Sequence, residues 1–220
     1  MRIENVQEES RYIPALSFRW LTPFYDPVLK WGMREEIFKR HLVAQADLRP
    51  GMQVLDLGCG TGTLTILLKQ SQLAAGVNGL DGDPDVLDIA QDKASNAGAS
   101  IHWSCGLAFA LPYTDGVFDR VVASLVLHHM TSSQKRRTFG ELQRVLRPGG
   151  ELHIVDFGRP HSPVMSAMAL VMRHFEETAD HFAGLLPAML SESGFAQVTE
   201  TSYFATVFGP LSLYAAMKPQ

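Results

Sequence analysis

One stretch decides the fold of this chain: Val54-Leu55-Asp56-Leu57-Gly58-Cys59-Gly60-Thr61-Gly62, an apolar run that ends in an acid and three alternate glycines. The helix-like run Thr63-Leu64-Thr65-Ile66-Leu67-Leu68 follows directly. This order predicts a buried parallel strand, a tight loop and a helix. A loop that turns sharply and lies against a ligand has no room for Cβ atoms and often needs positive φ angles, which glycine supplies. We therefore expect the loop to bind a ligand.

The spacing of the glycines separates two kinds of nucleotide ligand. A dinucleotide fingerprint requires G-x-G-x-x-G, whereas here the glycines are Gly58, Gly60 and Gly62, and Thr63 stands where the third glycine would fall. Asp56, just before the loop, would repel a pyrophosphate and suit a cation. S-adenosylmethionine (SAM) carries a sulfonium and an ammonium group, so the loop favours SAM over NAD. A tight turn without any ligand remains an alternative at this point.

A second acid strengthens the nucleotide interpretation. Residues 74–80 are typical of the next short strand, which ends in Asp81-Gly82-Asp83-Pro84 before an amphipathic helix. An acid at the tip of the second strand, about 20 residues past the glycine loop, is where a ribose presents its vicinal hydroxyls. We assign this role to Asp81. A helix N-cap is its alternative role, but Asp83 fits that better because proline follows it.

Six motifs in this order resemble those of class I SAM-dependent methyltransferases. The resemblance is strong over residues 50–157, and it is closest to the branch with ubiquinone and menaquinone biosynthesis C-methyltransferases and many small-molecule methyltransferases. Several ordered motifs are far more specific than one glycine loop. The motifs are residues 54–68, Gly79-Leu80-Asp81, Leu111-Pro112-Tyr113, Phe118-Asp119-Arg120-Val121-Val122, Leu125-Val126-Leu127-His128-His129 and Val145-Leu146-Arg147-Pro148-Gly149-Gly150.

The alternation of strands and helices predicts an α/β fold, a Rossmann-like, mostly parallel sheet with helices on both faces. We expect strands at 52–57, 75–80, 100–104, 118–123 and 151–157, and helices at 33–46, 61–70, 84–96, 132–146 and 179–193. Two β-rich runs, 196–204 and 209–217, have no helix between them and predict an antiparallel edge hairpin, as in the seven-stranded sheet of the resembled family. The 220 residues suit one domain, divided into an N-terminal helical cap (1–48), a SAM-binding core (49–157), a substrate-covering insertion (158–180) and a C-terminal helix with the hairpin (181–220).

Ligands of open parallel sheets bind beyond the carboxyl ends of the strands. The cofactor should therefore contact the ends of the first four strands. The resemblance adds Tyr25, whose Tyr-Asp pair is similar to an N-terminal signature of the quinone-type branch. The predicted cofactor-binding residues are Tyr25, Asp56, Gly58, Cys59, Gly60, Asp81, Gly82, Gly106, Leu107, Ala108 and Ser124.

Two positions depart from the resembled family. The loop after strand three usually has Gly-Asp-Ala, in which the Asp accepts a hydrogen bond from the adenine amino group, whereas this chain has Gly106-Leu107-Ala108. The missing contact is worth roughly 0.5 to 1.5 kcal/mol, and packing of Leu107 on the ring would offset it. Gly82 stands where a larger apolar residue is common, which would thin one wall of the adenine slot.

Methyl transfer from a sulfonium is an in-line displacement that needs no metal and no covalent enzyme intermediate. The protein contributes alignment, exclusion of water and, for a protonated acceptor, a base. His128 and His129, just past strand four, are the candidate catalytic bases, although backbone contacts alone would also explain them. Asp156, at the end of strand five, is the other titratable group there, with an orienting role toward a backbone amide as its alternative.

Two segments are expected to cover the acceptor, residues 20–27 and the Met-rich residues 163–172. Met-rich surfaces adapt to varied apolar ligands, so a lipophilic or aromatic small molecule is the expected acceptor. The second segment could instead pack on the sheet or on a second subunit of a homodimer.

Composition excludes several function classes. A net charge of −4 and a sequence pI near 6.0 give no general attraction to nucleic acid, and Lys135-Arg136-Arg137 is interpreted as the solvated face of a helix. Cys59 and Cys105 make no disulfide framework or metal-ligand spacing and indicate a reducing compartment. The polar N-terminus is unlike a signal peptide, and no apolar run is long enough for a membrane span. We expect a cytoplasmic protein.

The sequence thus predicts a SAM-dependent methyltransferase acting on a small, apolar or aromatic molecule. Two alternatives remain open: an enzyme that uses SAM for another reaction, and a catalytically silent SAM-binding subunit. The glycine loop, Asp56 and Asp81 argue only for binding, so they do not separate these functions.

Overall fold

A computed structural model of the chain describes residues 35–163, 165–166, 178–206 and 209–220. Tyr25, the predicted cap up to residue 34 and the central part of the predicted insertion, residues 164 and 167–177, lie outside the described residues. Among the described residues, no helix has the length and apolar character needed to cross a membrane.

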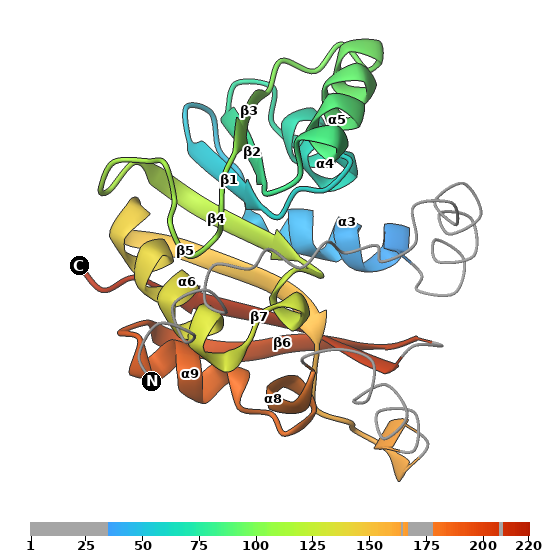
Figure 1. Cartoon of the computed structure of the whole chain (residues 1–220), viewed down its shortest axis with the longest axis vertical. Coiled ribbons are helices and arrows are strands. Elements are labelled where there is room, and N and C mark those ends of the chain that lie inside the picture. The colour runs from blue at the N-terminus through green and yellow to red at the C-terminus, as the bar shows by residue number, and fades with distance from the viewer. Residues whose placement is uncertain (1–34, 164, 167–177, 207–208) are drawn as a thin grey trace, which may run out of the picture.

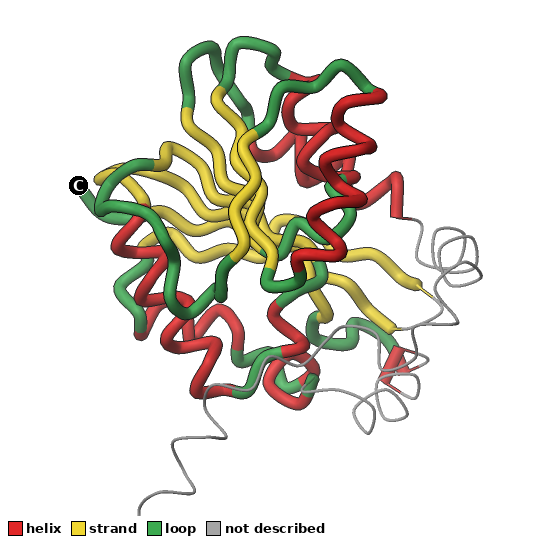
Figure 2. Tube along the Cα trace, turned by 45° about the horizontal axis from the view of Figure 1, so that its top comes forward, coloured by secondary structure: helices red, strands yellow, loops and turns green. Residues whose placement is uncertain are grey.

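The described strands form one twisted sheet with helices on both sides (Figures 1 and 2). The strand order is β3-β2-β1-β4-β5-β7-β6. Strands β1 to β5 pair in parallel, whereas β7 is antiparallel to both β5 and β6. This arrangement confirms the predicted mostly parallel sheet and its C-terminal antiparallel edge. The strands are β1 Gln53–Leu57, β2 Gly76–Asp81, β3 His102–Cys105, β4 Phe118–Ser124, β5 Leu146–Phe157, β6 Ala196–Thr206 and β7 Gly209–Met217.

The helices divide between the two faces of the sheet. Helices α3 (Glu35–Ala46), α4 (Thr63–Ser71) and α5 (Pro84–Asn96) pack on one face, and α6 (Ser132–Val145) and α9 (Leu186–Glu192) pack on the other. The short helix α8 (Ala179–Phe182) contacts β5, and its Phe182 packs against the layer on the α3 side. A single 3-10 turn, η2 (Leu127–His129), follows β4. Each face therefore carries its own apolar layer, one built around α3 and α4 and one around α6 and α9.

The two-residue period of β1 decides which side chains face which layer. Val54 belongs to the layer under α3 and α4, whereas Leu55 and Leu57 belong to the layer under α6 and α9. Asp56 shares the face of Val54, so its carboxyl group points toward α4. Val155 on β5 faces the layer under α3 and α4, so the next residue, Asp156, faces the α6 side of the sheet.

The strand order reverses direction between β1 and β4, because the chain runs outward to β3 before it returns to β4. Ligands of such sheets bind in the crevice beyond the carboxyl ends at this switch point. The glycine loop after β1 and the turn η2 after β4 flank it.

Three predicted details are wrong. The helix expected at 179–193 is split into α8 and α9, because Gly184 adopts a left-handed φ of 70° between them. Strand β5 begins at Leu146, which pairs with Phe118 before the register shifts, rather than at residue 151.

The third error concerns the basic run on α6. Lys135 is fully buried and pairs with Asp180 at 3.4 Å, so it does not lie on a solvated face. Arg136 is exposed and pairs with Glu192. The Arg137 guanidinium lies 4.8 Å from the centre of the Phe109 ring.

Candidate cofactor and active site

The glycine loop is shaped by close packing on one side and open space on the other. Gly58 has φ 66°, and a Cβ there would lie 2.3 Å from Cγ2 of Val126, so no larger residue fits. Gly60 has φ 53°, but no described atom lies within 4 Å of its Cβ position. The loop is therefore pressed against the chain after β4 at Gly58 and leaves room for a ligand at Gly60.

Strand β2 holds the loop in place. The amides of Gly58 and Cys59 donate to the carbonyl oxygen of Leu80 at 2.8 and 2.9 Å, and the amide of Gly60 donates to Oδ2 of Asp81 at 2.8 Å. The other carboxylate oxygen of Asp81 accepts from the amide of Asp83 at 3.1 Å. Each carboxylate oxygen has a second lone pair, so Asp81 retains acceptor capacity for a ligand hydroxyl.

Asp83, not Asp81, caps the helix that follows. Its Oδ1 accepts from the amide of Asp85 at 2.9 Å, and Pro84 occupies the first turn of α5. This confirms the predicted N-cap role of Asp83 and leaves Asp81 without a capping role, whereas the ribose contact of Asp81 stays a prediction.

Asp56 lies beneath the loop in a dry environment. It is 1% exposed, and its Oδ2 accepts a hydrogen bond from the Thr65 hydroxyl of α4 at 2.6 Å. Burial raises the pKa of Asp56 to about 6, against the lowering effects of Thr65 and of the nearby Lys39 charge. A carboxyl group with this pKa is sensitive to any cation that binds beside it.

The remaining loop residues differ in what they offer a ligand. Gly106 is fixed by its amide, which donates to the carbonyl oxygen of Asp81 at 2.9 Å. Gly82 accepts a weak hydrogen bond from the thiol of the exposed Cys105. Ala108 is buried in the core, so only its backbone is available, whereas Leu107 is half-buried. Burial raises the pKa of the Cys59 thiol, which therefore stays neutral.

Ser124 ends β4 at the switch point with an unsatisfied hydroxyl. Its Oγ is buried and has no hydrogen-bond partner among the described residues. A buried polar group without a partner costs free energy, so a ligand with a polar group at this point would gain a ready contact. The ends of three neighbouring strands provide these groups: Asp81 ends β2, Gly60 follows β1 and Ser124 ends β4. Together with Asp56 they fit a nucleoside that carries a cationic amino acid.

His128 lies on the turn η2 with one ring nitrogen fixed. Its Nδ1 is 2.8 Å from Oδ1 of Asp156, and the residue is 5% exposed. An ionised carboxylate only accepts hydrogen bonds, so Nδ1 of His128 carries a proton. The ring of His129 is half-exposed and lies 4.0 Å from that of His128, centre to centre.

The Asp156 carboxylate also accepts hydrogen bonds from backbone amides. Its Oδ2 accepts from the amides of Val126 and Leu127 at 3.2 and 2.8 Å, and its Oδ1 accepts from the amide of Phe157 at 2.8 Å. Burial alone would raise the pKa of Asp156, but His128 beside it and these donors hold it well below its usual range. The orienting role expected for Asp156 is confirmed, and the residue also orients His128.

Sequence reasoning missed His181 on α8. This residue is fully buried, its Nδ1 donates to the carbonyl oxygen of Phe157 at 2.9 Å, and the same nitrogen lies 3.8 Å from Oδ1 of Asp156. Nothing in the local pattern marks it, because a histidine at the start of an amphipathic helix is usually solvated. Only the fold brings it to Asp156.

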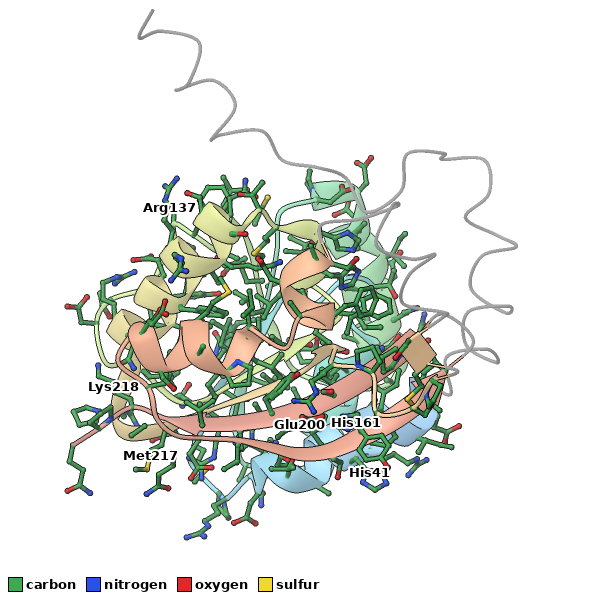
Figure 3. All side chains as sticks on the ribbon, turned by 90° about the horizontal axis from the view of Figure 1, so that it is seen from below. His41, Arg137, His161, Glu200, Met217 and Lys218 are labelled. Atoms are coloured by element: carbon green, nitrogen blue, oxygen red, sulfur yellow. The ribbon has the colours of Figure 1, made fainter. Side chains whose placement is uncertain are left out.

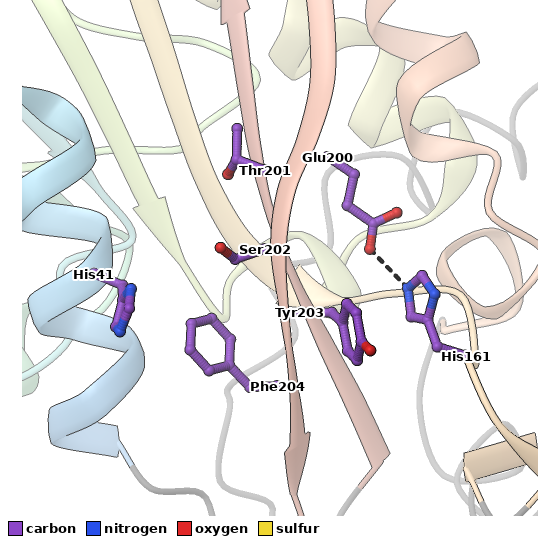
Figure 4. Close-up of a pocket in the computed structure, with 7 residues that line it drawn as sticks. All are labelled: His41, His161, Glu200, Thr201, Ser202, Tyr203 and Phe204. Carbon is purple, nitrogen blue, oxygen red and sulfur yellow. Dashed lines mark hydrogen bonds and ion pairs between the residues drawn. The ribbon is translucent and has the colours of Figure 1, made fainter.

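A separate cavity of about 580 Å³ lies at the β6 edge of the sheet (Figure 4). In Figure 3, His41, His161 and Glu200 lie together at this edge, well away from Arg137 on α6. Strand β6 is four places from β1 in the strand order, or roughly 19 Å at the usual strand spacing, so this cavity is not the cofactor site. It is lined by His41, His161, Glu200, Thr201, Ser202, Tyr203 and Phe204.

A family model described as a methyltransferase domain matches residues 54–150. The chain is 37% identical over 172 residues to an uncharacterized methyltransferase of Synechocystis, and the alignment covers 77% of this chain and 78% of the relative. It is 35% identical over 173 residues to the demethylmenaquinone methyltransferase of Thermus thermophilus, which covers 77% of this chain and 76% of the relative.

A solved structure agrees with the architecture. The YcgJ protein of Bacillus subtilis superposes with a TM-score of 0.66 at 18% identity, over 83% of this chain and 98% of that one. At this identity the likeness shows the fold alone.

The chain belongs to the class I SAM-dependent methyltransferases. Within that class it lies on the branch of the quinone methyltransferases, and its cofactor is SAM. The predicted enzyme class and cofactor are therefore confirmed, whereas the individual site residues, a homodimer and the absence of nucleic-acid binding stay predictions.

Proposed function

We propose that this methyltransferase acts on a small aromatic acceptor of the quinone type in its reduced, hydroquinone form. The demethylmenaquinone methyltransferase of Thermus thermophilus and the 2-phytyl-1,4-naphthoquinone methyltransferase of Synechococcus elongatus are relatives of this chain, at 35% and 34% identity. A methyl group on a sulfonium is an electrophile, so its acceptor must be electron-rich. A hydroquinone that has lost a proton meets this requirement, whereas the oxidised quinone does not.

When bound, SAM supplies the methyl group, and the electron pair of the broken carbon–sulfur bond stays on sulfur. Asp81 would hold the ribose hydroxyls with the lone pairs that the amides of Gly60 and Asp83 leave free. Asp56 would face the cationic end of the cofactor, and the unsatisfied hydroxyl of Ser124 would bind a polar group there. Leu107 would pack on the adenine ring.

The observation that carries the proposal is the 2.8 Å contact between His128 Nδ1 and Asp156 Oδ1. It assigns a proton to Nδ1, so Nε2 is the basic nitrogen of the ring in its neutral form. His128 would take the hydroxyl proton of the hydroquinone at Nε2, which raises the electron density of the ring carbon next to that oxygen. The buried Asp156 carboxylate stabilises the imidazolium that forms.

The reaction then releases one proton for each methyl group transferred. The ring carbon exchanges its hydrogen for the methyl group, and the aromatic ring is restored when that hydrogen leaves as a proton. His128 returns to its neutral form by passing its proton to the product oxygen or to water. Enclosure of His128, which is 5% exposed, keeps water from competing for the base.

The test uses the full chain with SAM and 2-prenyl-1,4-naphthoquinone kept reduced by dithionite, with formation of S-adenosylhomocysteine as the readout. We expect turnover that requires the reductant, and we expect H128Q to lose roughly 100-fold or more in kcat. The matched control is H41Q, which changes an exposed histidine at the far edge of the sheet and should leave turnover unchanged. Wild-type turnover in H128Q would contradict the role of His128, and methylation of the oxidised quinone alone would contradict the hydroquinone acceptor.

A further inference from the structure

Polar contacts hold helix α8 against both α6 and the end of β5. On one side, Oδ2 of Asp180 accepts from the Ser132 hydroxyl at 2.6 Å and pairs with the buried Lys135 ammonium of α6 at 3.4 Å. On the other side, the ring of His181 reaches the end of β5. The helix also packs through Phe182, whose ring centre lies 5.7 Å from that of Phe157. These contacts together define where His181 lies.

The protonation state of His181 follows from its contacts. A carbonyl oxygen only accepts, so the 2.9 Å contact with Phe157 places the proton on Nδ1. The other ring nitrogen, Nε2, is buried without a hydrogen-bond partner in the described part of the chain. Burial lowers the pKa of His181, and the nearby Lys135 charge acts in the same direction against the attraction of Asp156. His181 is therefore a neutral imidazole.

Two histidines thus share the surroundings of one carboxylate. His128 donates directly to Oδ1 of Asp156, whereas His181 lies 3.8 Å from the same oxygen and donates to the neighbouring carbonyl instead. Because His181 is neutral, it does not form an ion pair with the Asp156 carboxylate, and of the two histidines only His128 can do so. Because its ring is fully buried, it also keeps water from the same oxygen, and a charge pair in dry surroundings is stronger than one in water.

We propose that His181 is a positioning residue for His128, acting through the Asp156–Phe157 corner of β5. The proposal rests on the proposed role of His128 as the base. The neutral ring fixes the Phe157 carbonyl and the orientation of the Asp156 carboxylate, and the carboxylate in turn fixes the tautomer and the direction of the His128 ring. Asp180 contributes by holding α8, and with it His181, against α6.

Two variants separate this role from simple packing. In H181N, the side-chain amide nitrogen lies near the place of Nδ1, so the variant keeps a neutral donor for the Phe157 carbonyl. In H181L, the volume stays similar but the donor is lost. Both are made in the full chain, and SAM affinity serves as the test of an intact fold, since the glycine loop follows β1 whereas α8 contacts β5, two places away in the strand order.

The first readout is the tautomer of His128, observed by nitrogen-15 NMR on the protein with SAM and no acceptor. We expect the Nδ1–H tautomer alone in the wild type and in H181N, and a mixture of tautomers in H181L. This readout needs no acceptor, so it stands even when the hydroquinone of the proposed function is not methylated. An unchanged His128 tautomer in an H181L protein that binds SAM normally would overturn the proposal.

The second readout is turnover with the reduced prenyl-naphthoquinone. We expect kcat to fall roughly 10- to 100-fold in H181L, as for a misplaced catalytic group, with KM within about threefold and recovery in H181N. In the H128Q background, H181L should cause no further loss, because the residue it positions is already gone. An equal loss in both backgrounds would overturn the proposal in favour of a general structural role.

Discussion

Acidification from pH 7 to pH 5 should weaken SAM binding by about tenfold through Asp56 alone. Burial raises the pKa of this carboxyl group to about 6 in the free protein, so it is about nine-tenths ionised at pH 7 and about one-tenth ionised at pH 5. A cationic ligand beside it favours the ionised form and lowers its pKa in the complex. Below pH 6 the ligand must therefore displace a proton, and affinity falls about tenfold for each pH unit.

The raised pKa of Asp56 has the opposite effect on the stability of the free protein, which gains from acidification where SAM binding loses. The folded-state pKa of Asp56 lies above its ordinary value of 3.8, so this residue's favourable contribution to folding is fully present below that value and is lost as pH rises through about 6. The variant D56N cannot ionise. Its stability relative to the wild type should increase between pH 5 and pH 7.5, by about 1 kcal/mol.

The assay is calorimetric titration of SAM and of S-adenosylhomocysteine into the wild type and D56N at pH 5.0, 6.0 and 7.0. S-adenosylhomocysteine keeps the ammonium group but lacks the sulfonium, so it identifies the cation that Asp56 senses. The wild type should lose affinity on acidification, whereas D56N should give a flat profile. The reasoning is refuted by a wild-type affinity that does not change with pH, or by the same dependence in D56N.

Three further changes probe the cofactor site. In urea denaturation, G58A should have a free energy of unfolding roughly 1 to 3 kcal/mol lower than that of G60A. Both glycines have positive φ, but only the Cβ at position 58 would lie against Val126. Equal losses of stability in the two variants would show that the loop relaxes around the added Cβ. D81A should weaken SAM by roughly 1.5 to 3 kcal/mol, whereas D83A should lower helix stability and leave calorimetric affinity unchanged, and the reverse pattern would move the ribose contact to Asp83. L107D should tighten SAM by up to roughly 1.5 kcal/mol but not its deaminated analogue, and equal changes for the two ligands would exclude an adenine-amine contact.

The strand, loop and helix that carry the candidate cofactor residues could be predicted from the sequence because they are local. Strand β1, its glycine loop and α4 are continuous in the chain, and the apolar run that forms the buried strand ends directly at the glycines. The division between Asp81 and Asp83 was also predictable, since Pro84 marks the start of α5 and so identifies the capping residue.

The catalytic half could be predicted only in part because its contacts are distant in sequence. His128, Asp156 and His181 lie on η2, β5 and α8, and their meeting depends on the pairing of β4 with β5 and on the placement of α8. The sequence identified the first two as titratable groups at one rim. It carried no signal for the third, whose role exists only once the helix is docked.

The errors have the same origin. Lys135 belongs to a run of three basic residues, which is usually solvated, but Asp180 lies 45 residues later and pairs with it in the interior. Pro148-Gly149-Gly150 is typical of a turn, yet Leu146 already pairs with Phe118 and the register shift absorbs the extra residues. In both cases a tertiary contact overrides a sound local preference.

The position of an isotopic label shows whether the enzyme transfers the methyl group to a ring carbon of a hydroquinone. The enzyme is mixed with SAM carrying a carbon-13 methyl group and with reduced 2-prenyl-1,4-naphthoquinone, and the product is isolated after a single turnover. We expect one labelled methyl group on the free ring carbon, with the carbon-13 shift of an aromatic methyl. A label on oxygen, or S-adenosylhomocysteine formed without any labelled ring, would contradict it.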